Sequence, residues 1–318
     1  MVMKNQFVAA AGIILASMCG CNESNEANVA PESSLYSWTV SEYSPENGFT
    51  IYNLKIGDDQ DLYAMGYKEP GRIFAKLVNG RWQTIASVDE SLSGILDFTF
   101  YNDTIYYTNG SSLKKAKGSF VTPILSGRVG GLEVFENKLI ITGGEPIPYA
   151  GNQYTIMSYE GGQTFIPIDN GIQSGAIKKV NNKLFIAGHE LKIYDGKKLI
   201  TSEFGGGFLN VDSQEAIYFG GQRAAHIEIL KFENNHYLDV GDVINSTAIV
   251  SALEFYEETA VMSAADGSNN LYQSFYLNGD NHWVEVPTSY YILDLINFNG
   301  KLFAATNDGV LLELKSTK

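Results

Sequence analysis

A short unit recurs along this chain of 318 residues and limits what the chain can fold into. Each copy is an apolar or alternating run, a tight polar turn and a second run that opens with an aliphatic residue. Three copies are nearly identical, namely FENKLIITGG from Phe135, VNNKLFIAG from Val180 and FNGKLFAATNDG from Phe298. Such runs, separated by turn residues, predict antiparallel β-hairpins. No stretch after residue 34 keeps a helical period over three turns, so we expect an all-β domain.

The number and spacing of the copies predict the architecture. The aliphatic residue that opens the second run marks seven copies, at Leu62, Ile105, Leu139, Leu184, Ala216, Ala260 and Leu302. Successive markers lie 32 to 45 residues apart, and four of the six intervals are 42 to 45 residues. A four-stranded propeller blade takes ~40–45 residues. We therefore predict a seven-bladed β-propeller, with six or eight blades as the alternative counts.

A second series predicts how the ring closes. The last strand of each unit opens with a bulky residue, at Trp82, Phe120, Phe165, Leu199, Tyr237 and Trp283. The seventh unit has no such strand, because the chain ends after VLLELKSTK. The missing strand stands at the other terminus, in SLYSWTV with Trp38. An open ring would leave an unpaired strand edge, so we expect this N-terminal strand to complete the last blade.

Short motifs resemble two groups of propellers. The sequence SYEGGQTF, residues 158–165, is similar to the Asp-box of sialidase-like propellers, with Glu160 and Phe165 in place of aspartate and tryptophan. The Gly-Gly pairs at residues 143–144 and 220–221 resemble Kelch repeats. The Asp-box resemblance implies a structural turn rather than an activity. A sialidase would also need a cluster of arginines, and this chain has four in all.

The N-terminal segment has the layout of a secretory signal, with Lys4 followed by a short apolar run and small residues. Its Met18-Cys19-Gly20-Cys21 sequence resembles a bacterial lipoprotein cleavage box, which implies a lipid on Cys21. We expect a signal peptide at 1–20, a flexible tether at 21–33 and the propeller at 34–318. Asn22 after the cysteine implies a lipid-anchored protein of the outer membrane, on its periplasmic side or at the cell surface. The alternative is an ordinary signal peptide with two incidental cysteines.

Composition and motifs narrow the possible chemistry. A net charge of −14 disfavours nucleic acid as a partner. There is no Gly-x-Ser-x-Gly elbow and no cysteine beyond residue 21, so nothing supports nucleophilic catalysis. Dinucleotide- and phosphate-binding motifs are also missing from the sequence. We therefore expect a monomer without a cofactor, a metal or catalytic residues.

Candidate binding residues lie between the second and third strands of the predicted blades, in segments 66–71, 143–153, 220–226 and 264–270, and after Gly188. Loops longer than a tight turn requires are frequent binding sites. The candidates are Tyr67, Glu69, Glu145, Tyr149, His189, Glu190, Arg223, His226 and Asp266. A second polar series falls on the predicted innermost strands and could line a wet central channel. Its members are Asn53, Lys55, Asp97, Glu133, Lys178, Asn210, Glu254 and Asp294.

These observations favour a membrane-tethered, non-catalytic scaffold that binds a protein or glycan partner in the bacterial envelope. One alternative is an enzyme that acts on glycans or small metabolites with carboxylates or histidines of the loop face. Another is a purely structural role in envelope assembly. Two carboxylates ~5–10 Å apart in one pocket would favour the enzyme.

Overall fold

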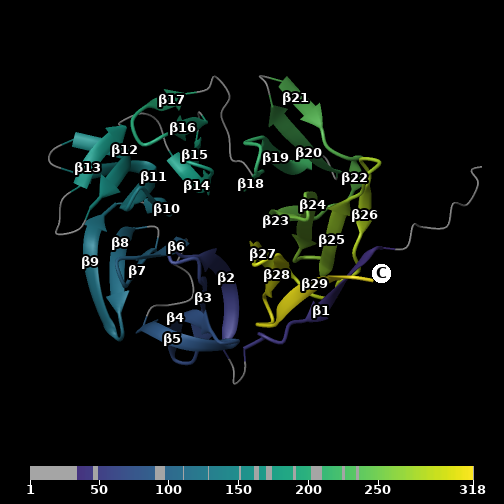
Figure 1. Ribbon diagram of the computed structural model, residues 1–318, viewed down its shortest axis with the longest axis horizontal. Coiled ribbons are helices and arrows are strands. Elements are labelled where there is room, and N and C mark those ends of the chain that lie inside the picture. The colour runs from purple at the N-terminus through teal and green to yellow at the C-terminus, as the bar shows by residue number, and fades with distance from the viewer. Residues whose placement is uncertain are drawn as a thin grey trace, which may run out of the picture. The chain divides into compact units, whose positions relative to one another are not determined.

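Seven antiparallel sheets follow one another around a central axis in the part of the chain that the structure describes (Figure 1). The structure is a computed structural model, and residues 34–318 form one unit of it. It describes residues 34–45, 49–89, 97–109, 111–127, 129–149, 152–160, 165–169, 174–188, 191–201, 210–223, 226–233 and 236–317. All its regular elements are strands. The predicted seven-bladed β-propeller is therefore confirmed.

The first four blades each consist of four consecutive strands, ordered from the axis outward. Blade one contains β2 (Thr50–Ile56), β3 (Leu62–Lys68), β4 (Gly71–Val78) and β5 (Arg81–Val88). Blade two contains β6 (Asp97–Tyr101), β7 (Thr104–Thr108), β8 (Ser112–Lys117) and β9 (Phe120–Ser126). Blade three contains β10 (Val129–Phe135), β11 (Lys138–Tyr149), β12 (Asn152–Tyr159) and β13 (Phe165–Asp169). Blade four contains β14 (Ser174–Val180), β15 (Lys183–Gly188), β16 (Lys192–Tyr194) and β17 (Leu199–Thr201).

The last three blades depart from this plan in two places. Blade five contains β18 (Asn210–Val211), β19 (Ile217–Arg223), β20 (His226–Glu233) and β21 (His236–Asp239), and β22 (Ile244–Asn245) also pairs with β20. Blade six contains β23 (Ile249–Tyr256), β24 (Thr259–Asp266), β25 (Leu271–Leu277) and β26 (Trp283–Glu285). Blade seven contains β27 (Ile292–Phe298), β28 (Lys301–Thr306), β29 (Leu311–Ser316) and, outermost, β1 (Tyr36–Val40).

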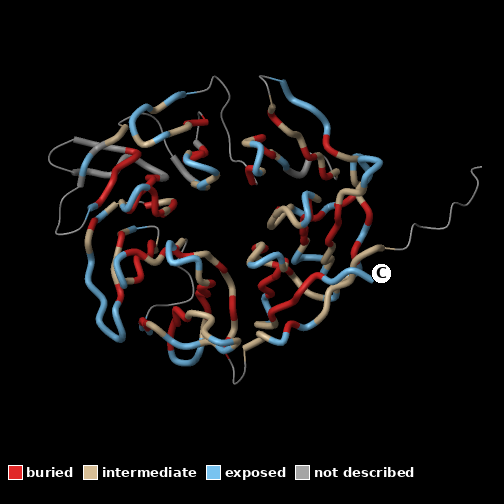
Figure 2. The backbone as a smooth tube through the Cα atoms, viewed as in Figure 1, coloured by how far each residue is buried: buried red, intermediate tan, exposed pale blue. Residues whose placement is uncertain are grey.

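The second strand of every blade is buried on both faces, because it is sandwiched between the neighbouring blades. In β3, Leu62 packs toward Phe303 of blade seven, whereas the next residue, Tyr63, packs in a cluster with Phe98 of blade two. This explains why second strands are nearly continuous apolar runs instead of alternating ones. All seven marker residues are at most 3% exposed. Figure 2 shows buried residues concentrated within the sheets and exposed ones at the turns.

The turns between first and second strands explain why the copies of the repeated unit resemble one another in sequence. Asn102 and Asp103 have φ of 48° and 53°, and Asn299 and Gly300 have φ of 52° and 72°. Two successive residues with positive φ form the turn that suits the twist of a two-residue hairpin. Asparagine and glycine adopt this conformation at low cost. The Asn-Asp and Asn-Gly pairs are thus turn formers.

The N-terminal strand closes the ring as predicted. β1 runs antiparallel to β29 with Trp38 opposite Leu314. The Trp38 Nε1–H donates to Ser274 Oγ of blade six at 2.7 Å, and the Tyr36 ring packs edge-on against Tyr276 at a centroid distance of 4.9 Å. One five-residue strand therefore completes blade seven and also attaches it to blade six.

Loss of this strand should open the ring. We expect deletion of residues 34–40 to abolish the cooperative unfolding transition, and Trp38→Ala to lower the free energy of unfolding by about 2–4 kcal/mol. Urea titrations followed by circular dichroism would measure both. Val40→Ala is the matched control, because Val40 lies in the same strand but is 58% exposed, and should change stability by less than about 0.5 kcal/mol. A deletion protein with the wild-type urea midpoint would refute the closure.

Candidate binding cavities

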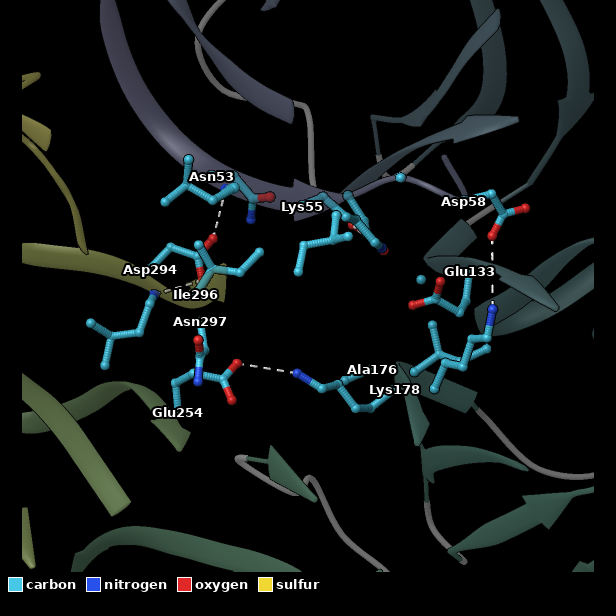
Figure 3. Close-up of a pocket in the computed structure, with 18 of the residues that line it drawn as sticks. Asn53, Lys55, Asp58, Glu133, Ala176, Lys178, Glu254, Asp294, Ile296 and Asn297 are labelled. Atoms are coloured by element: carbon cyan, nitrogen blue, oxygen red, sulfur yellow. Dashed lines mark hydrogen bonds and ion pairs between the residues drawn. The ribbon is translucent and has the colours of Figure 1, made fainter. Parts of the chain in front are cut away.

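A charged cavity of about 720 Å³ occupies the central channel (Figure 3). Six innermost strands line it, namely β2, β6, β10, β14, β23 and β27. Residues Gly57, Asp58, Gln60 and Asn181 of the turns between first and second strands also contribute. The cavity therefore reaches the face of these turns, opposite to the face on which the sequence placed the candidate binding residues.

The polar series predicted on the innermost strands lines this cavity, with one exception. Asn53, Lys55, Asp97, Glu133, Lys178, Glu254 and Asp294 are all lining residues. Asn210 is instead buried between blades. Its Nδ2 donates to the Leu253 carbonyl oxygen at 2.8 Å, and its Oδ1 accepts from the Val211 N–H at 2.8 Å. The sequence pattern thus identified the channel wall.

Lys55 joins the first three blades. Its Nζ lies 3.2 Å from Asp97 Oδ1 and donates to the Leu132 carbonyl oxygen at 2.6 Å. Asp97 in turn accepts from the Leu132 N–H at 2.8 Å. Burial alone would lower the pKa of Lys55, but the Asp97 and Glu133 carboxylates outweigh it and raise this pKa. The ammonium therefore stays charged at neutral pH and holds the innermost strands together.

Asp294 connects blades seven and one in a similar way. Its two carboxylate oxygens accept from the Leu54 N–H at 2.8 Å and the Leu295 N–H at 2.9 Å. Burial raises the pKa of Asp294 to about 7, because the two backbone bonds that favour the charged form compensate only in part. The nearby Glu254 carboxylate contributes to this rise. Asp294 is thus half-titrated near neutral pH.

An ion pair bridges blades four and six over the short inner strand of blade five. Lys178 Nζ lies 3.3 Å from Glu254 Oε2, as the dashed line in Figure 3 marks. Glu254 Oε1 also accepts the Phe255 N–H at 2.9 Å. Across the cavity, burial raises the pKa of Glu133, although Lys55 opposes this shift. The channel charges are therefore engaged with each other and with backbone N–H groups.

A second cavity, of about 630 Å³, lies where blades six and seven meet, and we call it the rim pocket. Its wall combines Thr247, Ile249, Val250 and Ser251, at the start of β23, with residues 265–269 and Tyr291. The Tyr291 ring stacks on Tyr272 with a centroid distance of 5.7 Å and an interplanar angle of 12°. This stack joins β25 of blade six to the residue preceding β27 of blade seven. The pocket lies on the face that the sequence favoured for binding.

Asp266 is the predicted candidate that lines the rim pocket, and its carboxylate organises the rim. Asp266 Oδ2 accepts from Thr247 Oγ1 at 3.0 Å and from Asn269 Nδ2 at 2.6 Å. Asp266 Oδ1 accepts from Ser268 Oγ at 2.5 Å and from the Ser268 N–H at 3.0 Å. Hydrogen bonds from Ser268, Asn269 and Thr247 lower the pKa of Asp266 to about 2. The group is therefore an ionised turn former.

The other candidates are spread over several blades. Tyr67 is the penultimate residue of β3, and Glu69 lies in the exposed turn before β4. His226 begins β20 and pairs with Asn245 of β22. Glu145, Tyr149 and Arg223 lie within strands, but their side chains are outside the described part. His189, Glu190 and Cys21 are outside the described residues altogether.

The connections expected to be long loops are mostly strand. β11 continues to Tyr149 and pairs with β12, which begins at Asn152, so the described part of the segment 143–153 is strand. The Gly-Gly pairs that resemble Kelch repeats lie inside β11 and β19 instead of ending them. Proline and glycine in 143–151 suggested a loop, but pairing with β12 keeps this segment extended as far as Tyr149.

Two negative findings apply to the described residues. They contain no group of three or more His, Cys, Asp or Glu side chains that could hold a metal ion. No helix long and apolar enough to cross a bilayer occurs among them either.

Comparisons with known proteins identify the fold. The sequence matches no family model and no curated protein. A catalytically inactive virginiamycin B lyase from Staphylococcus aureus, crystallised with quinupristin, is similar in structure, with a TM-score of 0.60, 12% identity and coverage of 88% of this chain and 99% of that one. BamB from Moraxella catarrhalis matches with a TM-score of 0.55 and 11% identity over 89% and 98% of the two chains.

A third similar structure is an extracellular domain. That domain, from the putative one-component system BT4673 of B. thetaiotaomicron, has a TM-score of 0.56 and 8% identity, and the match covers 88% of this chain and 40% of that one. At such low identities these similarities establish the class of protein, a β-propeller, and leave the activity to be argued from the site.

The raised pKa of Asp294 predicts a pH-dependent stability. Because folding raises this pKa from 3.8 to about 7, the protonated form is favoured in the folded state. The resulting stabilisation is complete below about pH 4 and is lost as pH rises toward 7. Between pH 5 and 8, wild type should lose up to about 3 kcal/mol more unfolding free energy than Asp294→Asn. Urea titrations at both pH values would measure this, with exposed Asp308→Asn as control. Parallel losses in wild type and Asp294→Asn would contradict the assignment.

Proposed function

We propose that this protein is an envelope-tethered, non-catalytic scaffold that binds a protein or glycan partner on the face of the rim pocket. The observation that carries the proposal is that carboxylates in both cavities accept hydrogen bonds from the protein itself. Asp97 and Asp294 accept backbone N–H groups from neighbouring blades, and Asp266 accepts four hydrogen bonds from its own surroundings. These carboxylates therefore have structural roles, Asp97 and Asp294 between the innermost strands of adjacent blades and Asp266 in the rim pocket.

The protonation state of Asp266 supports binding over catalysis at the rim pocket. A general acid or base works best with a pKa near the working pH. With its pKa at about 2, Asp266 is ionised at neutral pH and cannot donate a proton. The other polar groups of the pocket are hydroxyls and an amide. Such groups orient and hold a ligand but do not transfer protons near pH 7.

An enzyme that acts on glycans or small metabolites is the second candidate, and the channel favours it. Asp294 has its pKa near 7, and the nearby Glu254 carboxylate contributes to this value. Two carboxylates with different protonation states are the usual requirement for glycoside hydrolysis. Against this, both oxygens of Asp294 accept backbone hydrogen bonds within the fold. We therefore rank the scaffold first.

The membrane anchor is a separate part of the proposal and rests on the sequence. The Met18-Cys19-Gly20-Cys21 segment resembles a lipoprotein box, and the acidic, polar segment after it suits a tether. A lipid on Cys21 would place the propeller at the outer membrane, with residues 22–33 between the anchor and the first strand. The neighbours of low identity do not bear on this point.

Fatty-acid labelling would test the anchor. Cells that express the wild-type chain in the presence of a radioactive or clickable palmitate analogue should label it, and Cys21→Ser should carry no label, because the thiol is the group that carries the lipid. Cys19→Ser is the matched control and should label like wild type. Label retained on Cys21→Ser would contradict the assignment.

A capture experiment combined with product analysis would test the scaffold role. The purified protein, immobilised, should retain a recurrent protein or glycan from detergent-solubilised envelope in near-stoichiometric amount. Mass spectrometry of the eluted partner after prolonged incubation should find it chemically unchanged. A shortened or modified partner, with the change lost in Asp294→Asn, would establish the enzyme instead. Recovery of no partner would also contradict the scaffold.

A further inference from the structure

We infer that the rim pocket is a subsite for one neutral sugar unit of a glycan. The inference rests on the proposed binding function and narrows it from a protein or glycan partner to an uncharged saccharide. Three properties of the pocket carry it, namely an aromatic and aliphatic wall, a rim of hydrogen-bond acceptors, and a charge pattern that excludes anions. A pocket of about 630 Å³ lies within the ~300–1,000 Å³ typical of ligand sites.

The apolar part of the wall is held in place before any ligand binds. Tyr291 lines the pocket and is stacked on Tyr272 at 5.7 Å, so that its ring is fixed between two blades. Ile249 lines the same pocket and is 61% exposed. A large aliphatic side chain left exposed beside an aromatic ring indicates a surface for an apolar face of a ligand. A pyranose presents such a face through its C–H groups.

The polar part of the wall matches a ligand that is rich in hydroxyl groups. Thr247 and Ser268 each donate their hydroxyl proton to Asp266, and Asn269 donates from Nδ2 to the same carboxylate. A hydroxyl that donates its proton keeps lone pairs with which it can accept. Asp266 thereby orients the hydroxyl oxygen atoms of the rim as acceptors. Sugar hydroxyls are the complementary donors, whereas phosphate and carboxylate groups offer acceptors only.

The charges around the pocket disfavour small ligands that are themselves charged. None of the residues that line it is basic, and Asp266 is ionised at neutral pH with a pKa of about 2. An anionic ligand would therefore meet a negative charge without a compensating cation, in a chain of net charge −14. Four hydrogen bonds already satisfy the Asp266 carboxylate, so this group does not require a bound cation.

Binding to neutral polysaccharides would test the inference directly. We would run the full chain, purified in detergent, in native affinity gels that contain amylose, β-1,3-glucan, β-1,4-xylan or mannan, and titrate the matching hexasaccharides by calorimetry. Wild type should bind at least one of them. Tyr291→Ala should weaken that binding about tenfold or more, since it removes the aromatic wall. Tyr291→Phe, which keeps the ring, should stay within about threefold of wild type.

The controls separate a local effect from loss of structure. Tyr237→Ala removes a tyrosine that is 43% exposed on the outer strand β21 of blade five, away from the pocket, and should bind like wild type. Thermal unfolding of each variant identifies one that fails to fold. In that case Asn269→Ala, an exposed change at the rim, replaces it and should weaken binding severalfold.

Each remaining outcome overturns one proposal and not the other. Failure to bind any of the four polysaccharides, binding only of an anionic polymer such as polygalacturonate, unchanged affinity in Tyr291→Ala, or a partner that proves to be a peptide would each refute the sugar subsite. None of these would contradict a scaffold role. Conversely, a hexasaccharide that is bound through Tyr291 but recovered in shortened form would refute the non-catalytic role and leave the subsite in place.

Discussion

The pairing of β1 with β29 is the interaction on which the rest of the structure depends. Every other blade is built from consecutive strands, whereas in the described part of the chain this pairing joins the two ends of the propeller through backbone hydrogen bonds. The same N-terminal segment continues to blade one, where the Trp82 Nε1–H donates to the Tyr43 carbonyl oxygen at 2.7 Å. The segment thus contacts blades six, seven and one. Without it, the ring would have an unpaired edge and two uncovered apolar faces.

Closure also determines the character of the central channel. Each innermost strand has one edge without a sheet partner. The backbone N–H and C=O groups on that edge therefore need hydrogen-bond partners from elsewhere. The chain meets this demand with side chains from adjacent blades. Asp97 accepts the N–H of Leu132, and Asp294 accepts that of Leu54. The cost of partly burying these carboxylates is offset by the N–H donors, by Lys55 for Asp97, and by protonation for Asp294.

The two cavities consequently have different chemistry. In the channel, charged groups connect blades, and a ligand there would have to compete with these contacts. In the rim pocket the carboxylate of Asp266 is held locally, because its hydrogen bonds come from its own turn and from Thr247 nearby. Its wall offers an aromatic ring, an isoleucine and neutral oxygen atoms. Such a wall suits the recognition without proton transfer that we propose.

Much of the fold could be predicted because its determinants are local or can be counted. Turn residues and alternating runs indicated the hairpins, the marker residues from Leu62 to Leu302 predicted the seven blades, and the unpaired last unit identified the strand with Trp38. The polar positions of the innermost strands predicted the channel wall, since a wet axis tolerates polar side chains wherever the blade pattern repeats. Asn210 differed because its side chain is buried and hydrogen-bonds the Leu253 carbonyl oxygen of the next blade.

The rim pocket could not be predicted in this way. Residues 265–269 of its wall fall in the candidate segment 264–270, with Asp266 as the named residue, but Thr247 and Ile249 near the start of β23 and Tyr291 before β27 were not candidates. No sequence spacing relates these residues, and none predicts that the rings of Tyr272 and Tyr291 stack. The sequence alone determined the blades, their number and their closure, because these follow from periodic burial and strand pairing. Only the tertiary structure decided which side chains share a cavity, because that depends on how neighbouring blades are placed around the axis.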